Sequence, residues 1–186
     1  MPKFNNKILR LVSIAGVTFV IGLAVAALVW GNAGGSKINA GGQYINPRLQ
    51  FSFQYDNGYN VTELYEQKTE SGLTFDTVTL APTDVSKSEI KIEVYENPGT
   101  EDITEWVVSH QKESHFDKTE NKFESSGDGT LKVIGYEWQK EDGAGSVIGM
   151  LREGRVYLFV GRNASDVSAA RESLARVLSS LDFELR

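Results

Sequence analysis

Residues 155–181 read RVYLFVGRNASDVSAARESLARVLSSL and contain both patterns that decide the fold class. Over 155–161 aliphatic and aromatic residues alternate with a period of two, which predicts a strand. An apolar stripe with helical spacing follows, made of Val167, Ala170, Leu174, Val177, Leu178 and Leu181. Ser165 or Asp166 can cap this helix, and its single apolar face must lie on a sheet. The stretch therefore predicts a helix packed on a β-sheet.

The same alternation marks further strands on the N-terminal side of this stretch. They are expected at residues 50–55, 61–66, 90–95, 131–139 and 146–152. Between Leu73 and Leu80 the apolar phase slips midway, which predicts a β-bulge in another strand. A second helix is expected over Glu101–Ser114, because apolar residues recur there at i, i+3, i+4 and i+7. Short turns join the strands, so the sequence predicts an α+β fold with one antiparallel sheet of about six or seven strands and helices packed on it.

The first thirty residues have the composition of a membrane anchor. Leu11–Trp30 contains no charged residue over twenty positions, and a helix of about 20 residues spans the roughly 30 Å hydrocarbon core of a bilayer. We expect Leu11, Phe19, Leu23 and Trp30 to contact the membrane along this helix. The charged residues before it are all positive, which places them on the cytoplasmic side: Lys3, Lys7 and Arg10.

This anchor divides the chain into four expected parts. They are a basic cytoplasmic tail (1–10), a transmembrane helix (11–30), a glycine-rich linker (31–42) and an extracytoplasmic domain (43–186). The alternative is a signal peptide cleaved near Ala33, which would release a secreted domain. The apolar run is longer than the about 7 to 15 residues typical of a signal peptide, which favours a single-pass protein retained in the cell membrane.

The composition excludes several classes of function. The chain has no cysteine, which removes disulfides, thiol nucleophiles, iron–sulfur clusters and cysteine-ligated zinc. Three of the 19 basic residues precede Leu11, so 16 basic and 25 acidic residues lie beyond Trp30, a net charge of −9. A domain with this charge repels phosphate backbones, so we expect no nucleic-acid partner.

No pattern in the sequence identifies a catalytic, cofactor-binding or metal site. His110 and His115 are five residues apart, which places them on different sides of a helix and excludes a chelating pair. His110 continues an apolar stripe and is expected to pack at the helix end, whereas His115 lies in a polar stretch and is expected to be exposed. The chain contains no nucleophile elbow, Walker sequence or calcium loop. We therefore expect a domain without catalysis, cofactor or metal.

Several segments resemble PsbP-like domains. In order along the chain they are YINP (44–47), LQFSFQY (49–55), the Gly58-Tyr59 turn, the strand at 90–95, the helix with Trp106 and the closing helix that runs into LSSLDF (178–183). One departure is Asp56, where many members carry a proline. The resemblance covers residues 43–186. It implies a compact antiparallel sheet with helices packed on it, in a family whose known members act mainly as accessory or binding subunits, and it assigns no functional residue.

Two kinds of function remain open. The domain is expected to bind another protein of the cell envelope, with Tyr59, Tyr65 and Tyr95 as the partner surface, because tyrosine is favoured in interface cores. The alternative is a small-ligand-binding or hydrolytic domain, with its site in a cleft between the sheet and the Glu101–Ser114 helix. Two glycosylation patterns, at Asn60 and Asn163, matter only in a lineage that glycosylates.

Overall fold

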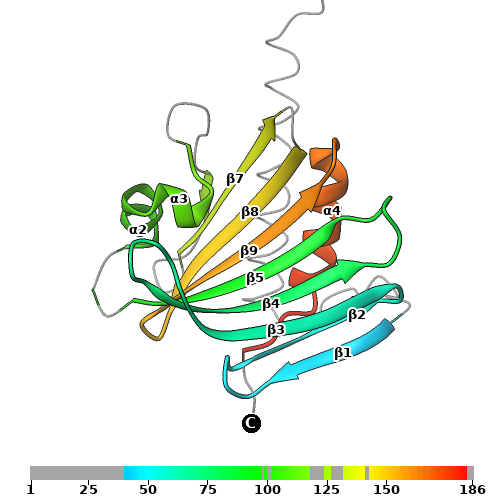
Figure 1. Ribbon diagram of the computed structural model, residues 1–186, viewed down its shortest axis with the longest axis horizontal. Helices are drawn as coiled ribbons and strands as arrows, with labels where there is room; N and C mark the ends of the chain where they lie inside the picture. Colours follow the sequence, from blue (N-terminus) through cyan, green and yellow to red (C-terminus); the bar gives the residue numbers. More distant parts are fainter. Residues whose placement is uncertain are drawn as a thin grey trace, which may run out of the picture.

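The computed structural model describes residues 40–97, 99, 102–117, 124–126, 132–140 and 143–183. Over these ranges the chain forms a seven-stranded sheet, a separate two-stranded sheet and three helices (Figure 1). All neighbouring strands in the larger sheet are antiparallel. The expected α+β class with an antiparallel main sheet is therefore confirmed.

The main sheet runs in the order β3-β4-β5-β9-β8-β7-β6. Its strands are β3 (Tyr59–Lys68), β4 (Thr74–Pro82), β5 (Glu89–Glu96), β6 (Glu124–Ser126), β7 (Val133–Lys140), β8 (Gly143–Arg152) and β9 (Arg155–Asn163). The turn between β8 and β9 has positive φ at both central residues, 51° at Glu153 and 73° at Gly154. A turn of this kind matches the twist of a tight hairpin. This hairpin pairs β9 with β8, and β9 pairs with β5 on its other side. The strand therefore lies at the centre of the sheet, where both faces are covered.

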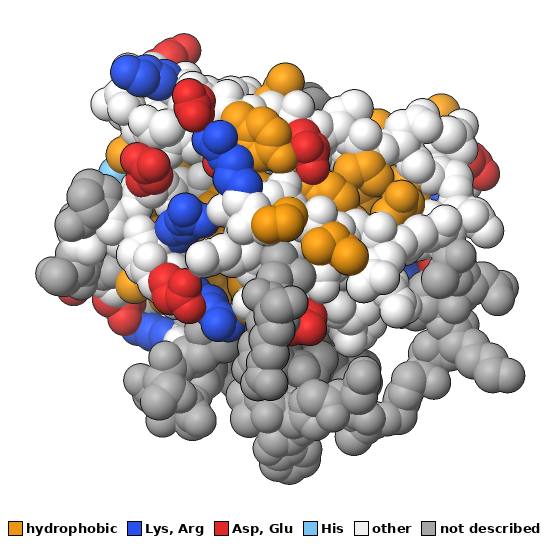
Figure 2. Space-filling model, turned by 90° about the horizontal axis from the view of Figure 1, so that it is seen from below, with side chains coloured by type: hydrophobic (Ala, Val, Ile, Leu, Met, Phe, Trp, Pro, Cys, Tyr) orange, Lys and Arg blue, Asp and Glu red, His pale blue; other side chains and the backbone are white. Residues whose placement is uncertain are grey.

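A second, smaller sheet pairs β1 (Ala40–Asn46) with β2 (Phe51–Asp56). This pair was not expected, because β1 begins inside the segment 31–42 predicted to be a linker. The inward face of β2 packs on the main sheet through Phe51 and Phe53, which are almost fully buried. Figure 2 views the molecule from below Figure 1, the side on which β1 and β2 lie, and shows hydrophobic side chains at the surface between charged ones.

The helix α4 (Val167–Leu178) covers the same face of the main sheet as β1 and β2. Asp166 caps it by accepting a hydrogen bond from the Ser168 backbone N–H, which was one of the two expected caps. Gly161 on β9 permits the close approach, because a Cβ there would lie 2.5 Å from the Ala170 carbonyl oxygen. We call this side of the sheet the α4 face. Its buried core includes Phe51, Phe53, Val78, Leu80, Ile92, Tyr157, Phe159, Leu174 and Leu178.

The opposite side, the α3 face, carries α2 (Ile103–Ser109) and α3 (Gln111–Ser114) beside β7 (Figure 1). The single helix expected over Glu101–Ser114 is interrupted at His110, whose φ of −115° and ψ of 52° are not helical. The buried core of the α3 face includes Tyr95, Ile103, Trp106, Val107, Phe116, Ile134, Tyr136, Val147, Val156, Leu158 and Val160. Both faces of the sheet are therefore covered.

The β-bulge predicted between Leu73 and Leu80 is wrong. The strand β4 pairs with β5 in continuous register from Phe75 to Leu80. The apolar phase slips because the strand contributes to two cores: Phe75 packs on the α3 face, whereas Leu80 is buried on the α4 face. The irregularity of this hairpin lies in β3 instead, around Glu66, which has a φ of 54°.

The predicted anchor, Leu11–Trp30, lies outside the residues that the structure describes. Among the described residues, no helix combines the length and the apolar composition that crossing a bilayer requires. The anchor and the division of the chain at residues 30 and 42 therefore stay predictions from the sequence.

Candidate functional site

A cavity of about 510 Å³ opens between α3 and the adjoining ends of β7, β8 and β9. Its volume falls within the about 300 to 1,000 Å³ common for small-molecule sites. We call it the α3 pocket. It occupies the cleft between sheet and helix in which the alternative function placed a site. Six of its lining side chains are aromatic or cationic: Lys112, His115, Phe116, Trp138, Lys140 and Arg162.

The floor of the α3 pocket is a row of three residues across neighbouring strands. Trp138 on β7 pairs in register with Gly145 on β8, and Gly145 pairs with Arg162 on β9. A Cβ on Gly145 would lie 2.0 Å from the Trp138 ring, so the indole lies flat over this strand. Glycine at this position therefore leaves a smooth aromatic surface that extends towards the Arg162 strand.

Behind the pocket, the carboxylate of Glu93 is buried in the middle of β5, with only 3% of the residue exposed. Lys91 Nζ lies 2.7 Å from one oxygen, and the Tyr95 hydroxyl donates a hydrogen bond of 3.0 Å to the other. Burial raises the pKa of this carboxyl, but the neighbouring His115 ring and the Lys91 ammonium outweigh it and hold the pKa at about 2. Glu93 is therefore a buried anion at neutral pH.

The ring of His115 lies between this anion and the cavity. Its Nε2 is 3.7 Å from Glu93 Oε2, a contact too long for a hydrogen bond, and this nitrogen is buried without a hydrogen-bond partner among the described residues. Its Nδ1 accepts a hydrogen bond of 3.3 Å from the Arg162 guanidinium. Because arginine can only donate, Nδ1 carries no proton and the ring proton is on Nε2, directed towards Glu93.

The backbone holds His115 in this position at a cost. The residue has a φ of 59° and a ψ of 18°, the left-handed conformation, where it ends α3. A residue with a side chain pays about 1 kcal/mol or more for this conformation. The Tyr136 hydroxyl also donates to the carbonyl of Ser114, which fixes the preceding residue to the sheet. The expectation that His115 is exposed is therefore wrong, since the fold turns its ring inwards.

The described lining of the α3 pocket carries aromatic and cationic side chains beside the pair of Glu93 and His115. An oriented carboxylate–histidine pair also occurs in hydrolases, where a serine, threonine or cysteine completes it. None of the described residues that line this pocket is a serine, threonine or cysteine. The described part of the chain also contains no cluster of three histidine or acidic residues that could hold a metal ion.

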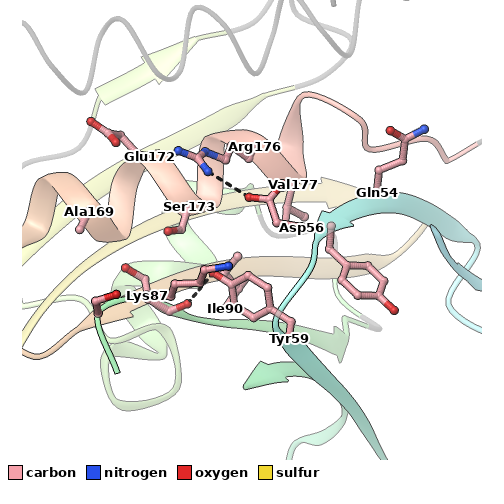
Figure 3. A pocket seen from close by; sticks show the side chains of 13 residues that line it. Gln54, Asp56, Tyr59, Lys87, Ile90, Ala169, Glu172, Ser173, Arg176 and Val177 are labelled. Atoms are coloured by element: carbon pink, nitrogen blue, oxygen red, sulfur yellow. Dashed lines mark hydrogen bonds and ion pairs between the residues drawn. The ribbon is translucent and has the colours of Figure 1, made fainter. Parts of the chain in front are cut away.

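A smaller cavity of about 190 Å³, the α4 pocket, lies between α4, β2 and β3 on the opposite face (Figure 3). Figure 3 shows Arg176 reaching from α4 to Asp56, and the two side chains form an ion pair of 3.0 Å. Lys87 donates to the Asn57 carbonyl oxygen at 2.7 Å and lies 5.5 Å above the Tyr59 ring centre. These cations already have partners within the chain, which indicates a structural role.

Comparison with known proteins bears on the fold. No protein-family model matches the chain, and no curated protein matches its sequence. The solution structure of cyanobacterial PsbP (CyanoP) from Synechocystis sp. PCC 6803 is similar, with a TM-score of 0.55 over 82% of this chain and 98% of that one. The fold is PsbP-like. The sequences are 15% identical, so this likeness concerns the fold alone.

A second solved structure, from Bacteroides thetaiotaomicron VPI-5482, matches 75% of this chain and 47% of its own length, at 16% identity. Its TM-score of 0.44 is too low to establish a shared fold. The expected resemblance to PsbP-like domains is thus confirmed at the level of fold by the cyanobacterial structure.

The three tyrosines expected to form a partner surface lie in different parts of the PsbP-like domain. Tyr59 is half-buried beside the α4 pocket. Tyr65 is 37% exposed, and its hydroxyl donates to Glu63 at 2.6 Å. Tyr95 is 2% exposed and donates to Glu93 on the α3 face. They do not share one patch, and a role in partner binding stays a prediction, for which Tyr65 offers exposed area.

His110 packs at the end of α2, as expected. Its ring centre lies 4.7 Å from that of Trp106 with an angle of 24° between the planes. Its Nδ1 lies 2.9 Å from the Trp106 carbonyl oxygen, which can only accept, so the ring donates there. This histidine is therefore held by contacts within its own helix.

Reasoning from the sequence missed the residues that the PsbP-like sheet brings together. Glu93 was assigned to a polar face of β5, alternating with Ile92 and Val94, and that face is covered by the α2–α3 segment. The signal was available in part, because Tyr95 shares this face and two helices were predicted for one sheet. The row of Trp138 and Arg162 depends on strand register, which no local pattern specifies.

Proposed function

We propose that this chain is a single-pass membrane protein whose extracytoplasmic domain binds another component of the cell envelope in the α3 pocket, without catalysis. The observation that carries the binding site is the α3 pocket itself, where a buried anion at Glu93 orients His115 towards the cavity. A site whose walls are fixed before the ligand arrives loses less entropy on binding. The membrane location rests on the uncharged segment Leu11–Trp30 and the three positive charges before it.

The PsbP-like fold supports a binding role by analogy alone, since a fold can host several functions. The stronger support is chemical: the described lining residues include aromatic and cationic side chains but no hydroxyl or thiol nucleophile. Such a wall suits recognition of a partner group.

The membrane location is tested by fractionating native membranes that contain the full chain. We expect the intact N-terminus in the membrane fraction after alkaline extraction, because a single apolar helix holds it there. A soluble product that begins after Ala33 would show that the segment is a cleaved signal peptide.

The binding role is tested by cross-linking the full chain in its native membrane and comparing what it captures with two variants. Arg162→Gln alters the α3 pocket, and Arg176→Gln alters an arginine of the same kind beside the α4 pocket. We expect Arg162→Gln to lose the component captured by the natural chain and Arg176→Gln to retain it. Identical capture by all three proteins would place the binding site elsewhere.

A hydrolytic role is the second candidate, favoured by the pairing of Glu93 with His115. In that case a water molecule would be the nucleophile and Nδ1 the base, so the hydrogen bond from Arg162 would have to open first. Turnover of ester or amide substrates by the full chain, abolished by His115→Ala but not by His110→Ala, would establish this role in place of pure binding.

A further inference from the structure

We infer that the α3 pocket takes a small organic anion: a carboxylate or phosphate held by Arg162 and Lys140, attached to a flat apolar body that lies on Trp138. This inference rests on the proposed binding function and names the chemical class of the ligand. Arginine and lysine recognise both kinds of head group, so the two are separated by experiment.

Positive charge predominates in the described lining of the α3 pocket. The described lining of the α3 pocket includes three permanent cations and one carboxylate, Asp117, in a chain whose net charge is −6. One of the cations, Lys112, is already paired with Glu70. Arg162 and Lys140 form no salt bridge with any described carboxylate, even though Glu89 is the cross-strand neighbour of Arg162. Two cations without an ion-pair partner among the described residues, at the mouth of a concave site, attract an anion.

The contrast with other basic residues in the domain supports this reading. Arg171 pairs with both oxygens of Glu137, at 2.5 and 3.0 Å, and Arg176 pairs with Asp56 at 3.0 Å. Arg162, by comparison, donates one hydrogen bond to the neutral Nδ1 of His115. A guanidinium has five N–H donors, so most of those on Arg162 can still reach a ligand.

The α3 pocket has a flat aromatic floor. The Trp138 indole lies flat across Gly145, and its plane is within 20° of the His115 ring, with 6.0 Å between ring centres. Phe116 adds apolar area to the same cavity. The cavity of about 510 Å³ has room for many water molecules, each of which occupies about 30 Å³ in the liquid, so it is much larger than a lone phosphate. A ligand that fills the site therefore needs an apolar part beside its charged group.

A hydrogen bond to His115 fixes the direction of the Arg162 side chain. Nδ1 of His115 accepts a hydrogen bond from Arg162, which ties one N–H of the guanidinium to the wall of the pocket and leaves the ring proton on Nε2, on the side of Glu93. Arg162 pairs in register with Gly145, the residue over which the Trp138 indole lies. The backbones of Trp138 and Arg162 are two strand spacings apart, about 10 Å. The indole lies over Gly145 between them, so a ligand whose head group is on Arg162 can lay its flat body on the indole.

The test uses the full chain in a non-ionic detergent and isothermal titration calorimetry with three probes of similar shape: phenylacetate, phenyl phosphate and the neutral phenylacetamide. We expect at least one of the two anions to bind and the amide not to bind. Arg162→Gln should weaken that binding about tenfold or more, the loss typical of one charge-assisted hydrogen bond. The matched variant Arg176→Gln should bind as the natural chain does, and thermal unfolding of both variants checks that they fold.

The identity of the better probe assigns the head group as carboxylate or phosphate. Equal binding of the amide, equal affinity of Arg162→Gln, or no binding of either anion would overturn the inference. Loss of the captured envelope component in Arg162→Gln without probe binding would leave the proposed function standing and refute the anion alone. Binding of a probe in the pocket, with unchanged capture of the envelope component by Arg162→Gln, would support the anion site and refute the proposed function.

Discussion

The two faces of the main sheet differ in how their interiors are built. On the α4 face, β1, β2 and α4 close over aromatic and aliphatic side chains, and the two cations beside the α4 pocket, Lys87 and Arg176, have partners within the chain. On the α3 face, the buried carboxylate of Glu93 lies under a strained His115 and opens towards a cavity of about 510 Å³. The same strands therefore carry a stabilising core on one side and a polar site on the other.

This difference indicates where stability and function are separated. Apolar burial contributes about 1.5 to 3 kcal/mol for each large side chain and needs no specific partner. A buried charge is costly unless it is paired, so its presence requires a fixed arrangement of neighbours. The strain and burial on the α3 face have the character of a site under functional constraint.

The largest effect is expected from the α4 face. Phe51 is fully buried between the rings of Phe53 and Tyr157. Phe51→Ala should lower the free energy of unfolding by about 4 kcal/mol, because it leaves a cavity that the β1–β2 pair cannot close. Urea unfolding measures this change. An effect below about 1 kcal/mol would mean that the small sheet contributes little to the core.

The next effect comes from the buried anion. Glu93→Gln should cost about 3 kcal/mol near neutral pH, since it leaves the Lys91 ammonium without its counter-charge. The folded pKa of about 2 lies below the ordinary 4.5, so this stabilisation is complete above about pH 5 and is lost as the pH falls towards 2. The gap between the natural chain and the variant should shrink over that interval.

Exposed Glu96 on the same strand provides the matched control. Glu96→Gln should change the free energy of unfolding by less than about 0.5 kcal/mol. A gap for Glu93→Gln that stays constant from pH 5 to pH 2 would contradict the assignment of Glu93 as the titrating group.

A smaller effect is expected in the floor of the α3 pocket. Gly145→Ala should destabilise the domain by about 2 kcal/mol, because its methyl group would overlap the Trp138 ring. The loss should largely disappear when Trp138→Ala is also present, which a double-mutant cycle measures. Additive losses would show that the indole does not lie over this glycine in solution.

The smallest effect is expected at the α4 pocket. The Arg176 side chain is 63% exposed, so its ion pair with Asp56 is weak. Arg176→Gln should change the free energy of unfolding by no more than about 0.5 kcal/mol and leave ligand binding intact. Thermal unfolding and the phenylacetate titration check both points, and a clear loss of binding would erase the proposed distinction between the faces.

The fold was more predictable than the site, for physical reasons. Local alternation and helical spacing are enough to identify β9 and α4, because each buries one face in a regular period. The strand β1 escaped because its first residues are glycine-rich and its pairing with β2 is a tertiary contact. The site depends on pairing across β7, β8 and β9 and on the left-handed turn at His115, and neither leaves a local pattern.

The most direct test of the division between the two faces is a map of backbone amide chemical shifts for the full chain in detergent micelles, recorded with and without the better of the two anionic probes. We expect the changes to cluster at His115, along the ends of β7, β8 and β9, and at the Trp138 indole N–H. Changes centred on α4 or on the β1–β2 pair, with the α3 pocket unaffected, would contradict the claim that the α3 face carries the binding site.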